Sequence, residues 1–235
     1  MHMRRKPWAR PELAVCPYFI KDPFVMSGRW RASFPKEQPL WAEFGCGKGG
    51  FLAYMGPRMP EVNFLGVDLK SDVLGVARRA ISEAYGEEPV DNLRLSAFDL
   101  ERLPLCMDEN DRIDRLFIHF PNPWYKKSDH HKRLTHPKFL ERYRTLLAPG
   151  AELWFKTDDP GLFEATQEYL NQSGYRILEQ IADLPLGAFG LPSTEHEARF
   201  RAEGKPIGFI RAVPDENVPP LSSVLPLVKQ PVADV

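Results

Sequence analysis

A glycine-rich turn at residues 43–50, Glu-Phe-Gly-Cys-Gly-Lys-Gly-Gly, follows an apolar run and places an acid two residues before its first glycine. Glycines at the carboxyl end of a parallel strand let the backbone approach a ligand closely, and a following helix offers free N–H groups. Gly45, Gly47 and Gly50 also fit GxGxxG, the spacing of dinucleotide-binding turns. Glu43 would repel a pyrophosphate but suits the cationic amino-acid end of S-adenosylmethionine. We therefore predict that Glu43, Gly45 and Gly47 bind S-adenosylmethionine.

Two further acids follow the next two apolar runs. Asp68 stands 23 residues after Gly45 and could accept two hydrogen bonds from a ribose diol, which both NAD and S-adenosylmethionine carry. Asp99 could accept a hydrogen bond from an adenine amino group, although an acid directly after a strand is commonly a helix N-cap. Both positions predict a nucleoside site without choosing between the two cofactors.

A second cluster of functional side chains, Phe-Pro-Asn-Pro-Trp-Tyr-Lys-Lys at residues 120–127, follows a later apolar run. Two prolines restrict the backbone around Asn122, Trp124 offers a stacking face for a base, and Lys126 offers a phosphate contact. Ligands of open α/β sheets bind outside the carboxyl ends of the strands, so this cluster should lie beside the glycine turn. Such a cluster suits an RNA-modifying enzyme, and a rigid loop with a solvated basic rim is the simpler alternative.

Basic residues are concentrated around this cluster. The chain carries 31 Lys and Arg against 32 Asp and Glu, a net charge of -1, which argues against a sequence-blind nucleic-acid coat. Residues 115–144 nevertheless hold a net charge of +6 and four of the six histidines. Because a phosphate senses charge within a Debye length of ~8–10 Å, we predict a basic docking face here, joined by Arg4, Arg5 and Lys6. The cations of the segment are Arg115, Lys126, Lys127, Lys132, Arg133, Lys138, Arg142 and Arg144.

From Pro39 onward, short apolar runs alternate with longer helical patterns, which is typical of β–α units around a parallel sheet. We predict an α/β fold with a seven-stranded, mostly parallel, Rossmann-like sheet and helices on both faces. The helix over residues 72–85 is the best marked, with Ser71 as its N-cap and Gly86 as its stop. Helices are also predicted over 137–147 and 161–171, and strands over 40–44, 64–68, 93–97, 115–120, 152–156, 175–181 and 207–213.

Composition suggests one domain with two appendages. We predict a basic arm over residues 1–38, the domain over 39–213 and a proline-rich tail over 214–235. No apolar run approaches the ~20 residues of a membrane span, and the three cysteines form no CxxC pair. We therefore expect a cytoplasmic protein with reduced thiols, no membrane contact and no metal site. We expect the protein to be either a monomer or a homodimer.

Several motifs together resemble those of the bacterial tRNA (guanine-N7)-methyltransferase family. They are the Glu-x-Gly-x-Gly turn at 43–47, the segment 120–127, His-Lys-Arg-Leu at 131–134, Thr-Asp at 157–158, and Thr-x-x-Glu at 194–197 leading to Gly-Lys-Pro-Ile at 204–207. The resemblance covers about residues 43–208, and the proline-tryptophan-lysine segment is its most distinctive part. It implies a class I S-adenosylmethionine-dependent methyltransferase fold and a substrate guanine at position 46 of the tRNA variable loop.

Carried over position by position, the resemblance implies that Glu43, Asp68 and Asp99 hold the cofactor. It implies that the substrate is held by Lys126, Asp158, Thr194, Glu195 and Glu197. Thr-x-x-Glu is also a helix capping box, so the last three residues have a purely structural reading as well.

Asn122 departs from the family, which usually has aspartate between the two prolines. Guanine N7 is a lone pair without a proton, so methyl transfer to it requires alignment and tolerance of developing positive charge rather than a general base. We predict that Asn122 contacts both cofactor and reacting base, that its amide keeps a hydrogen bond but loses the charge, and that Asp158 supplies negative charge. Asn122 and Asp158 are thus the predicted catalytic residues.

Three other functions remain open at this stage. Asn122-Pro-Trp124 also resembles the Asn-Pro-Pro-aromatic loop of amino-group methyltransferases, in which the asparagine orients an exocyclic amine. This chain lacks the second proline after the asparagine. An NAD-dependent oxidoreductase would share the glycine turn, although Glu43 is unsuited to it. A tRNA-binding relative without catalysis would keep both surfaces, with Asn122 as the inactivating change.

Overall fold

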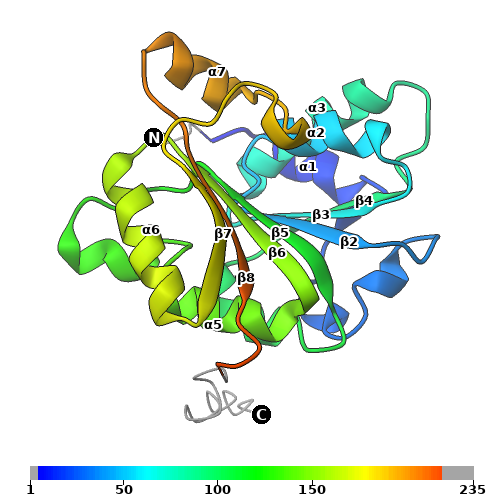
Figure 1. Ribbon diagram of the computed structural model, residues 1–235. Coiled ribbons are helices and arrows are strands. Elements are labelled where there is room, and N and C mark those ends of the chain that lie inside the picture. The colour runs from blue at the N-terminus through cyan, green and yellow to red at the C-terminus, as the bar shows by residue number, and fades with distance from the viewer. Residues whose placement is uncertain (1–4, 219–235) are drawn as a thin grey trace.

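Eight strands form one sheet in the computed structural model, which describes residues 5–218 (Figure 1). Their order across the sheet is β1-β4-β3-β2-β5-β6-β8-β7. Neighbouring strands are parallel from β1 to β6, and β8 is antiparallel to both β6 and β7. The strands are β1 Phe19–Ile20, β2 Leu40–Phe44, β3 Asn63–Asp68, β4 Leu93–Ala97, β5 Ile113–His119, β6 Leu147–Thr157, β7 Tyr175–Ile181 and β8 Gly208–Pro214.

The prediction of an α/β fold with a mostly parallel sheet is confirmed, and the predicted strand number is one too low. The missing strand, β1, has only two residues and pairs Phe19 with Leu95 at the edge beside β4. Two residues are too few to show an alternation of apolar and polar side chains. The strand predicted over 152–156 is longer, because β6 already begins at Leu147 and pairs there with Ile113 across a register shift.

Helices cover both faces of the sheet, as predicted (Figure 1). Consecutive residues of a strand point to opposite faces, so each strand feeds two cores. Phe44 of β2 packs in one core with Tyr143, and Phe64 of β3 packs in the other with Phe51 and Leu74. The first core lies under α5 Pro137–Leu146 and α6 Pro160–Gln172, and the second under α1 Ala9–Ala14, α2 Gly50–Met55, α3 Ser71–Tyr85 and α7 Glu195–Ala202. A short helix, α4 Leu103–Cys106, precedes β5.

Helix α3 confirms one predicted terminus and corrects the other. Gly86 ends the helix with a φ of +60°, a conformation that glycine adopts without steric cost. Ser71 is not the N-cap, because the helix begins at Ser71 itself and Lys70 precedes it without a side-chain cap bond. The Asp72 carboxylate instead accepts a hydrogen bond from the backbone N–H of Lys6, which ties the start of the described chain to this helix.

The segment predicted as an arm packs on the domain. Helix α1 lies against α3 (Figure 1), and Arg79 of α3 stacks over the ring of Trp8 at 3.5 Å. Trp30 is fully buried, and its indole N–H donates to the carbonyl oxygen of Cys106. Arg4 and the tail from residue 219 onward lie outside the described residues. The division of the chain at residues 38 and 213 stays a prediction.

Candidate functional site

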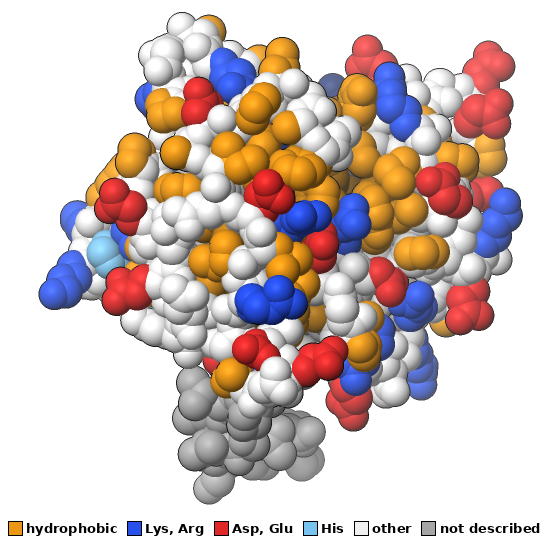
Figure 2. Space-filling model, viewed as in Figure 1, with side chains coloured by type: hydrophobic (Ala, Val, Ile, Leu, Met, Phe, Trp, Pro, Cys, Tyr) orange, Lys and Arg blue, Asp and Glu red, His pale blue; other side chains and the backbone are white. Residues whose placement is uncertain are grey.

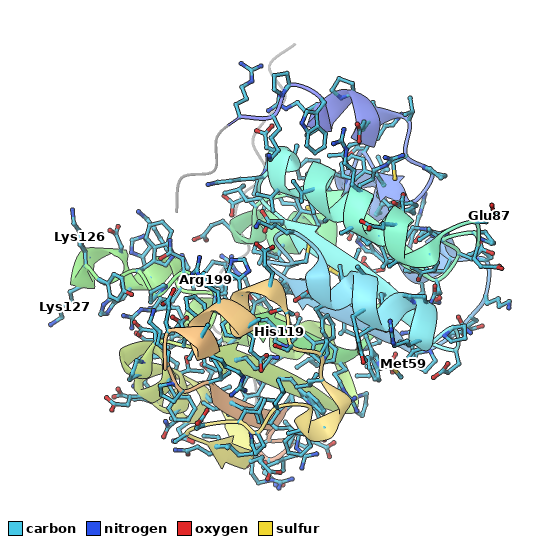
Figure 3. All side chains as sticks on the ribbon, turned by 90° about the horizontal axis from the view of Figure 1, so that it is seen from above. Met59, Glu87, His119, Lys126, Lys127 and Arg199 are labelled. Carbon is cyan, nitrogen blue, oxygen red and sulfur yellow. The ribbon has the colours of Figure 1, made fainter. Side chains whose placement is uncertain are left out.

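The predicted site residues come from five strand ends that meet at one edge of the sheet. Since β2 to β6 run parallel, their carboxyl ends share this edge, which Figure 3 views from above. Helix α7 covers the edge, and His119, the last residue of β5, lies beneath it near the centre of Figure 3. The edge therefore brings together Glu43, Asp68, Asp99, Asn122 and Asp158, which span 115 positions of the sequence.

The glycine turn after β2 has the open backbone that was predicted. Gly45 and Gly47 have φ values of +79° and +55°, which a side chain would strain. The N–H of Gly47 donates to Asp68 Oδ2 at 3.1 Å, and the N–H of Lys70 donates to Asp68 Oδ1 at 2.9 Å. Burial nevertheless raises the pKa of Asp68 above its usual range. Asp68 thus holds the turn after β2 against the end of β3.

Glu43 is buried beneath this edge, and only one of its two carboxylate oxygens has a hydrogen-bond partner within residues 5–218. Its Oε1 lies 3.0 Å from His119 Nδ1, whereas its Oε2 has no hydrogen-bond partner within residues 5–218. Burial raises the pKa of Glu43 to about 8, Asp68 adds to the rise, and the Lys156 ammonium acts against it. Burial also lowers the pKa of His119 far below its usual range, so the imidazole is neutral, and its Nδ1–H can donate to Glu43 when that carboxylate is ionised.

This carboxylate fits a cationic ligand. A buried acceptor oxygen without a partner costs free energy until a donor arrives, and an ammonium group supplies both donor and charge. His119 is buried beside Glu43, and its Nε2 also lacks a hydrogen-bond partner in the described chain. Sequence reasoning did not pair it with Glu43, because the contact depends on the register of β2 and β5.

Two of the predicted binding residues cap helices. Asp99 accepts a hydrogen bond from the N–H of Glu101 at 2.9 Å and so begins a 3-10 helix, Leu100–Arg102. Thr194 Oγ1 accepts from the N–H of Glu197 at 3.4 Å and begins α7, which is the N-cap half of the predicted capping box. The Glu197 carboxylate binds Lys156 and Arg201. The capping role uses part of each side chain and leaves its remaining acceptor capacity for a ligand.

The loop after β5 is held in an unusual conformation around Asn122. Phe120 and Trp124, on either side of the Pro-Asn-Pro segment, have φ values of +49° and +46°. Bulky residues rarely adopt this left-handed region, and such strain is concentrated at functional sites. Asn122 is exposed, and its Oδ1 accepts from the N–H of Trp124 at 3.1 Å. The indole of Trp124 in turn lies 5.0 Å from Lys132 Nζ.

The two predicted glutamates of α7 have opposite environments. Glu195 is exposed and pairs with Lys48 of the glycine turn at 2.8 Å. Glu197 is 2% exposed, and its carboxylate binds Lys156 Nζ at 2.7 Å and Arg201 Nε at 3.0 Å. Glu197 therefore points into the protein between sheet and helix. Lys156 was missed by sequence reasoning, and its only signal was a lysine within the apolar run before Thr157.

Asp158 lies at the rim of the site on the end of β6. Its carboxylate is 3.4 Å from the ammonium of Lys205, which belongs to the Gly-Lys-Pro-Ile segment of the resemblance. The pKa of Tyr125 is raised by partial burial and by Asp159 and Asp158, so the phenol lies near both acids. Tyr125 is 79% exposed and comes from the same loop as Asn122. The loop after β5 and the end of β6 thus form one rim.

The basic docking face is smaller than the count of charges predicts. Arg133 and Arg144 are buried and donate to backbone carbonyls, of Pro123 and Ser173 respectively. Arg115 is held between the rings of Trp41 and Trp154, at 4.3 and 4.6 Å. Lys138 and Arg142 both pair with Glu101.

What remains of the basic face is the loop between β5 and α5. Lys126 and Lys127 are exposed and project from the body of the protein at its far end (Figure 3). Figure 2 shows basic side chains and a histidine at the left edge, where this loop lies in Figure 1. His130 is close by, with its Nε2 at 2.9 Å from Arg133 Nη2.

A separate cavity of about 350 Å³ lies at the opposite, amino edge of the strands. Pro35, Asn63, Tyr85 and Asn92 are among its lining residues, and none of the predicted site residues is. The predicted site residues therefore lie away from this cavity. Within residues 5–218 no helix is long and apolar enough to cross a membrane. The same residues contain no group of three metal-ligating side chains.

Known proteins resemble this chain in both sequence and fold. A family model described as "Putative methyltransferase" matches residues 37–210. Among solved structures, the fold is similar to that of the 16S rRNA methyltransferase KamB, with a TM-score of 0.58 and 14% identity over 79% of this chain and 90% of that one. A 16S rRNA (adenine(1408)-N(1))-methyltransferase from Catenulisporales acidiphilia, solved with SAM, has a TM-score of 0.54 and 17% identity over 84% of this chain and 94% of that one.

Curated relatives are much more similar in sequence. A tRNA (guanine-N(7)-)-methyltransferase of Ruminiclostridium cellulolyticum is 44% identical over 90% of this chain and 92% of its own length. One of Clostridium botulinum is 42% identical over 92% of this chain and 100% of its own length. At this identity, and with both chains matched almost from end to end, the chain belongs to the tRNA (guanine-N(7)-)-methyltransferase family of enzymes.

Proposed function

We propose that this protein transfers a methyl group from S-adenosylmethionine to N7 of guanine in tRNA, and that the target is guanine 46 of the variable loop. The observation that carries the proposal is the buried Glu43 carboxylate with one unpartnered oxygen, beside a glycine turn and on the same strand edge as Asn122 and Asp158. Family membership supports the choice of tRNA guanine over other methyl acceptors.

In this proposal the cofactor is held by side chains and turns of the carboxyl edge. Glu43 binds the cationic amino-acid end, Gly45 and Gly47 let the backbone approach, and Asp68 and Asp99 bind the nucleoside. When bound, S-adenosylmethionine supplies a methyl group on a sulfonium, which is an electrophile without help from a metal. The unpartnered oxygen of Glu43 and the positive φ values of the turn are what support this fit.

The catalytic task of the protein is alignment. Guanine N7 carries a lone pair and no proton, so no side chain has to act as a general base. Holding two reactants in line can contribute on the order of 7–11 kcal/mol to the barrier reduction. Asn122 would position the base from a loop that two prolines and its own bond to Trp124 restrain. Asp158 would stabilise the positive charge that develops on the purine.

The tRNA would be held by residues of two segments, the loop after β5 and the first turn of α7. Lys126 would bind phosphate from the exposed loop, and Thr194 and Glu195 would face the base from the first turn of α7. Glu197 would hold α7 in place from its buried side and so position Thr194 and Glu195, because its carboxylate binds Lys156 and Arg201. A tRNA substrate also makes the cytoplasm the expected location of the protein.

Replacing Lys126 by alanine is expected to weaken tRNA binding about equally for all tRNA sequences. Removing one phosphate contact should also lower the slope of log Kd against log salt by about 1. The measurement is a binding titration with unmodified tRNA at several salt concentrations. Lys36→Ala is the matched control, because Lys36 is equally exposed but lies beside the cavity of the amino edge. An unchanged slope in Lys126→Ala would remove Lys126 from the docking face.

Replacing Asn122 by aspartate is expected to raise the single-turnover rate about tenfold, since a charge near the developing cation is worth ~1.4 kcal/mol or more. The carboxylate keeps the acceptor for the N–H of Trp124, so the loop conformation should persist. Asn171→Asp, at the exposed end of α6, adds the same charge elsewhere and should leave the rate unchanged. Equal rates for Asn122→Asp and the original protein would mean that alignment suffices.

One experiment tests the proposed function as a whole. The protein is incubated with unmodified tRNA and S-adenosylmethionine labelled on its methyl group, and the tRNA is then tested for chain cleavage at 7-methylguanine. Labelled cleavage at position 46 is the expected result. Label on an exocyclic amine would support the amino-group methyltransferase instead. Absence of transfer at every protein concentration, together with retained tRNA binding, would identify a binding protein.

A further inference from the structure

A buried ion cluster connects the cofactor edge of the sheet with helix α7. Its centre is Lys156 of β6, whose side chain is fully buried and donates to Glu197 Oε2 at 2.7 Å. The other oxygen of Glu197 accepts from Arg201 Nε at 3.0 Å and Nη2 at 2.8 Å. On the sheet, Lys156 is the register neighbour of His119, which lies 3.0 Å from Glu43. The cluster thus runs from the proposed cofactor acid to the first turn of α7.

Burying an ammonium group is costly, and a neutral side chain of the same length could fill the same space. One acid would suffice to neutralise it, yet two carboxylates act on Lys156, Glu197 of the helix by a direct ion pair and Glu43 of the sheet through its charge. We propose that Lys156 is a positioning residue that anchors α7 on the sheet and favours the charged form of the Glu43 carboxylate, which binds the cationic ligand. This inference rests on the proposed use of S-adenosylmethionine.

The electrostatic half of the role follows from the groups that face Glu43. They are His119 from β5, Asp68 from β3, Cys46 from the glycine turn, and Lys156 from β6. His119 and Cys46 are neutral, because burial lowers the pKa of the imidazole and raises the pKa of the thiol. The Asp68 carboxylate raises the pKa of Glu43 further. Lys156 is therefore the cation that lowers the pKa of Glu43 against burial and Asp68.

The groups that face Lys156 itself are Glu197 and Arg201 from α7 and Glu43 from the sheet. Burial and Arg201 lower the pKa of Lys156, whereas Glu197 and Glu43 raise it. The charged form of Lys156 is thus favoured by the same two carboxylates that it serves. Loss of either acid would weaken its hold on the other.

The mechanical half of the role follows from the position of Glu197. It is the third residue of α7, and the same helical turn carries Glu195, which pairs with Lys48 of the glycine turn. The cap residue Thr194 also borders this turn, since a Cβ on Gly50 would lie 4.0 Å from its Cβ. A helix held by Lys156 from below therefore covers the cofactor turn at a defined place.

The test compares Lys156→Met with the double variant Lys156→Met, Glu197→Gln. Methionine keeps the length of the buried lysine side chain. Without Lys156, the buried Glu197 carboxylate would be paired with Arg201 alone. Because Glu197→Gln removes that charge, the double variant should regain folding stability. Lys205→Met is the control, because Lys205 is an exposed lysine of the same rim. For each protein, binding of S-adenosylmethionine is measured from pH 6 to 9 by equilibrium dialysis, and exchange of the α7 amides is measured by mass spectrometry.

Affinity for S-adenosylmethionine should rise with pH as Glu43 ionises, and any fall at higher pH belongs to the amino group of the ligand in all four proteins. Both Lys156 variants should shift the rising limb upward by about one pH unit, which weakens binding about tenfold at pH 7. They should also exchange the α7 amides faster than Lys205→Met does. A purely structural lysine would instead let the double variant recover the original midpoint and the original exchange.

The outcomes separate this inference from the function on which it rests. An original midpoint in the double variant, or unchanged α7 exchange in both variants, overturns the inference and leaves the proposed function standing. Absence of S-adenosylmethionine binding by the original protein at every pH overturns the proposed function itself.

Discussion

Glutamine in place of Glu43 is expected to weaken binding of S-adenosylmethionine about 100-fold at pH 7. A buried carboxylate that loses its charge opposite a bound cation forfeits ~4 kcal/mol, about a thousandfold in affinity. Because the pKa of Glu43 is raised to about 8, only roughly one molecule in ten is ionised at pH 7, which reduces the difference tenfold. The deficit should therefore grow toward the full thousandfold as the pH rises through 8.

The variant also changes the shape of the pH profile. In the original protein affinity rises with pH until Glu43 is ionised, whereas Glu43→Gln has no such limb because the amide does not titrate. The amide oxygen can still accept from His119 Nδ1, so the buried contact is preserved. Isothermal titration calorimetry between pH 6 and 9 measures both effects. Glu87→Gln, an exposed acid after α3, is the control (Figure 3), and equal affinities for the two variants would refute the role of Glu43.

Asparagine in place of Asp158 is expected to lower the rate of methyl transfer about 100-fold, the loss typical for one preorganised electrostatic group at a reaction centre. In the proposed mechanism Asn122 stands where the resemblance implies an aspartate, so Asp158 would carry the negative charge opposite the developing purine cation. The affinity for S-adenosylmethionine should change little. The rate is measured in single turnovers with saturating tRNA and cofactor.

A second acid near Asp158 gives a matched control. Glu203 pairs with the other side of Lys205 at 3.1 Å, so Glu203→Gln removes one negative charge from the same lysine. If Asp158 acts only by restraining Lys205, the two variants should lose rate equally. A loss confined to Asp158→Asn would support its contact with the reacting base. The pair of results thus distinguishes charge at the reaction centre from organisation of the rim.

Local patterns were sufficient for most of the fold. The strands at 40–44, 93–97 and 175–181 have the predicted bounds, because apolar runs between turn residues specify strands by themselves. Gly86 and Thr194 have the predicted roles at helix ends, since caps depend on residues within one turn of the chain. Strand β1 was not predictable, because it is held by its partner β4 rather than by its own pattern.

The place of the candidate site residues in the fold follows from the sequence, whereas their burial and contacts do not. Glu43 and Asp68 lie at the carboxyl ends of β2 and β3, and Asn122 lies in the loop after β5. Parallel strands bring such positions to one edge in any fold of this class. Whether a charge is exposed at that edge is a different question. In the sequence, the eight cations of residues 115–144 cannot be told apart by exposure. In the structure, Arg133 and Arg144 are buried and donate hydrogen bonds to backbone carbonyl oxygens.

The amino-acid sequence therefore sufficed for the type of fold and the family of the protein, because these depend on short motifs and periodicity. The unpartnered oxygen of Glu43, its contact with His119 and the ion cluster of Lys156 with Glu197 were decided by tertiary structure alone. The two contacts join residues that lie 76 and 41 positions apart. Such contacts depend on strand register and helix docking, which no local pattern specifies.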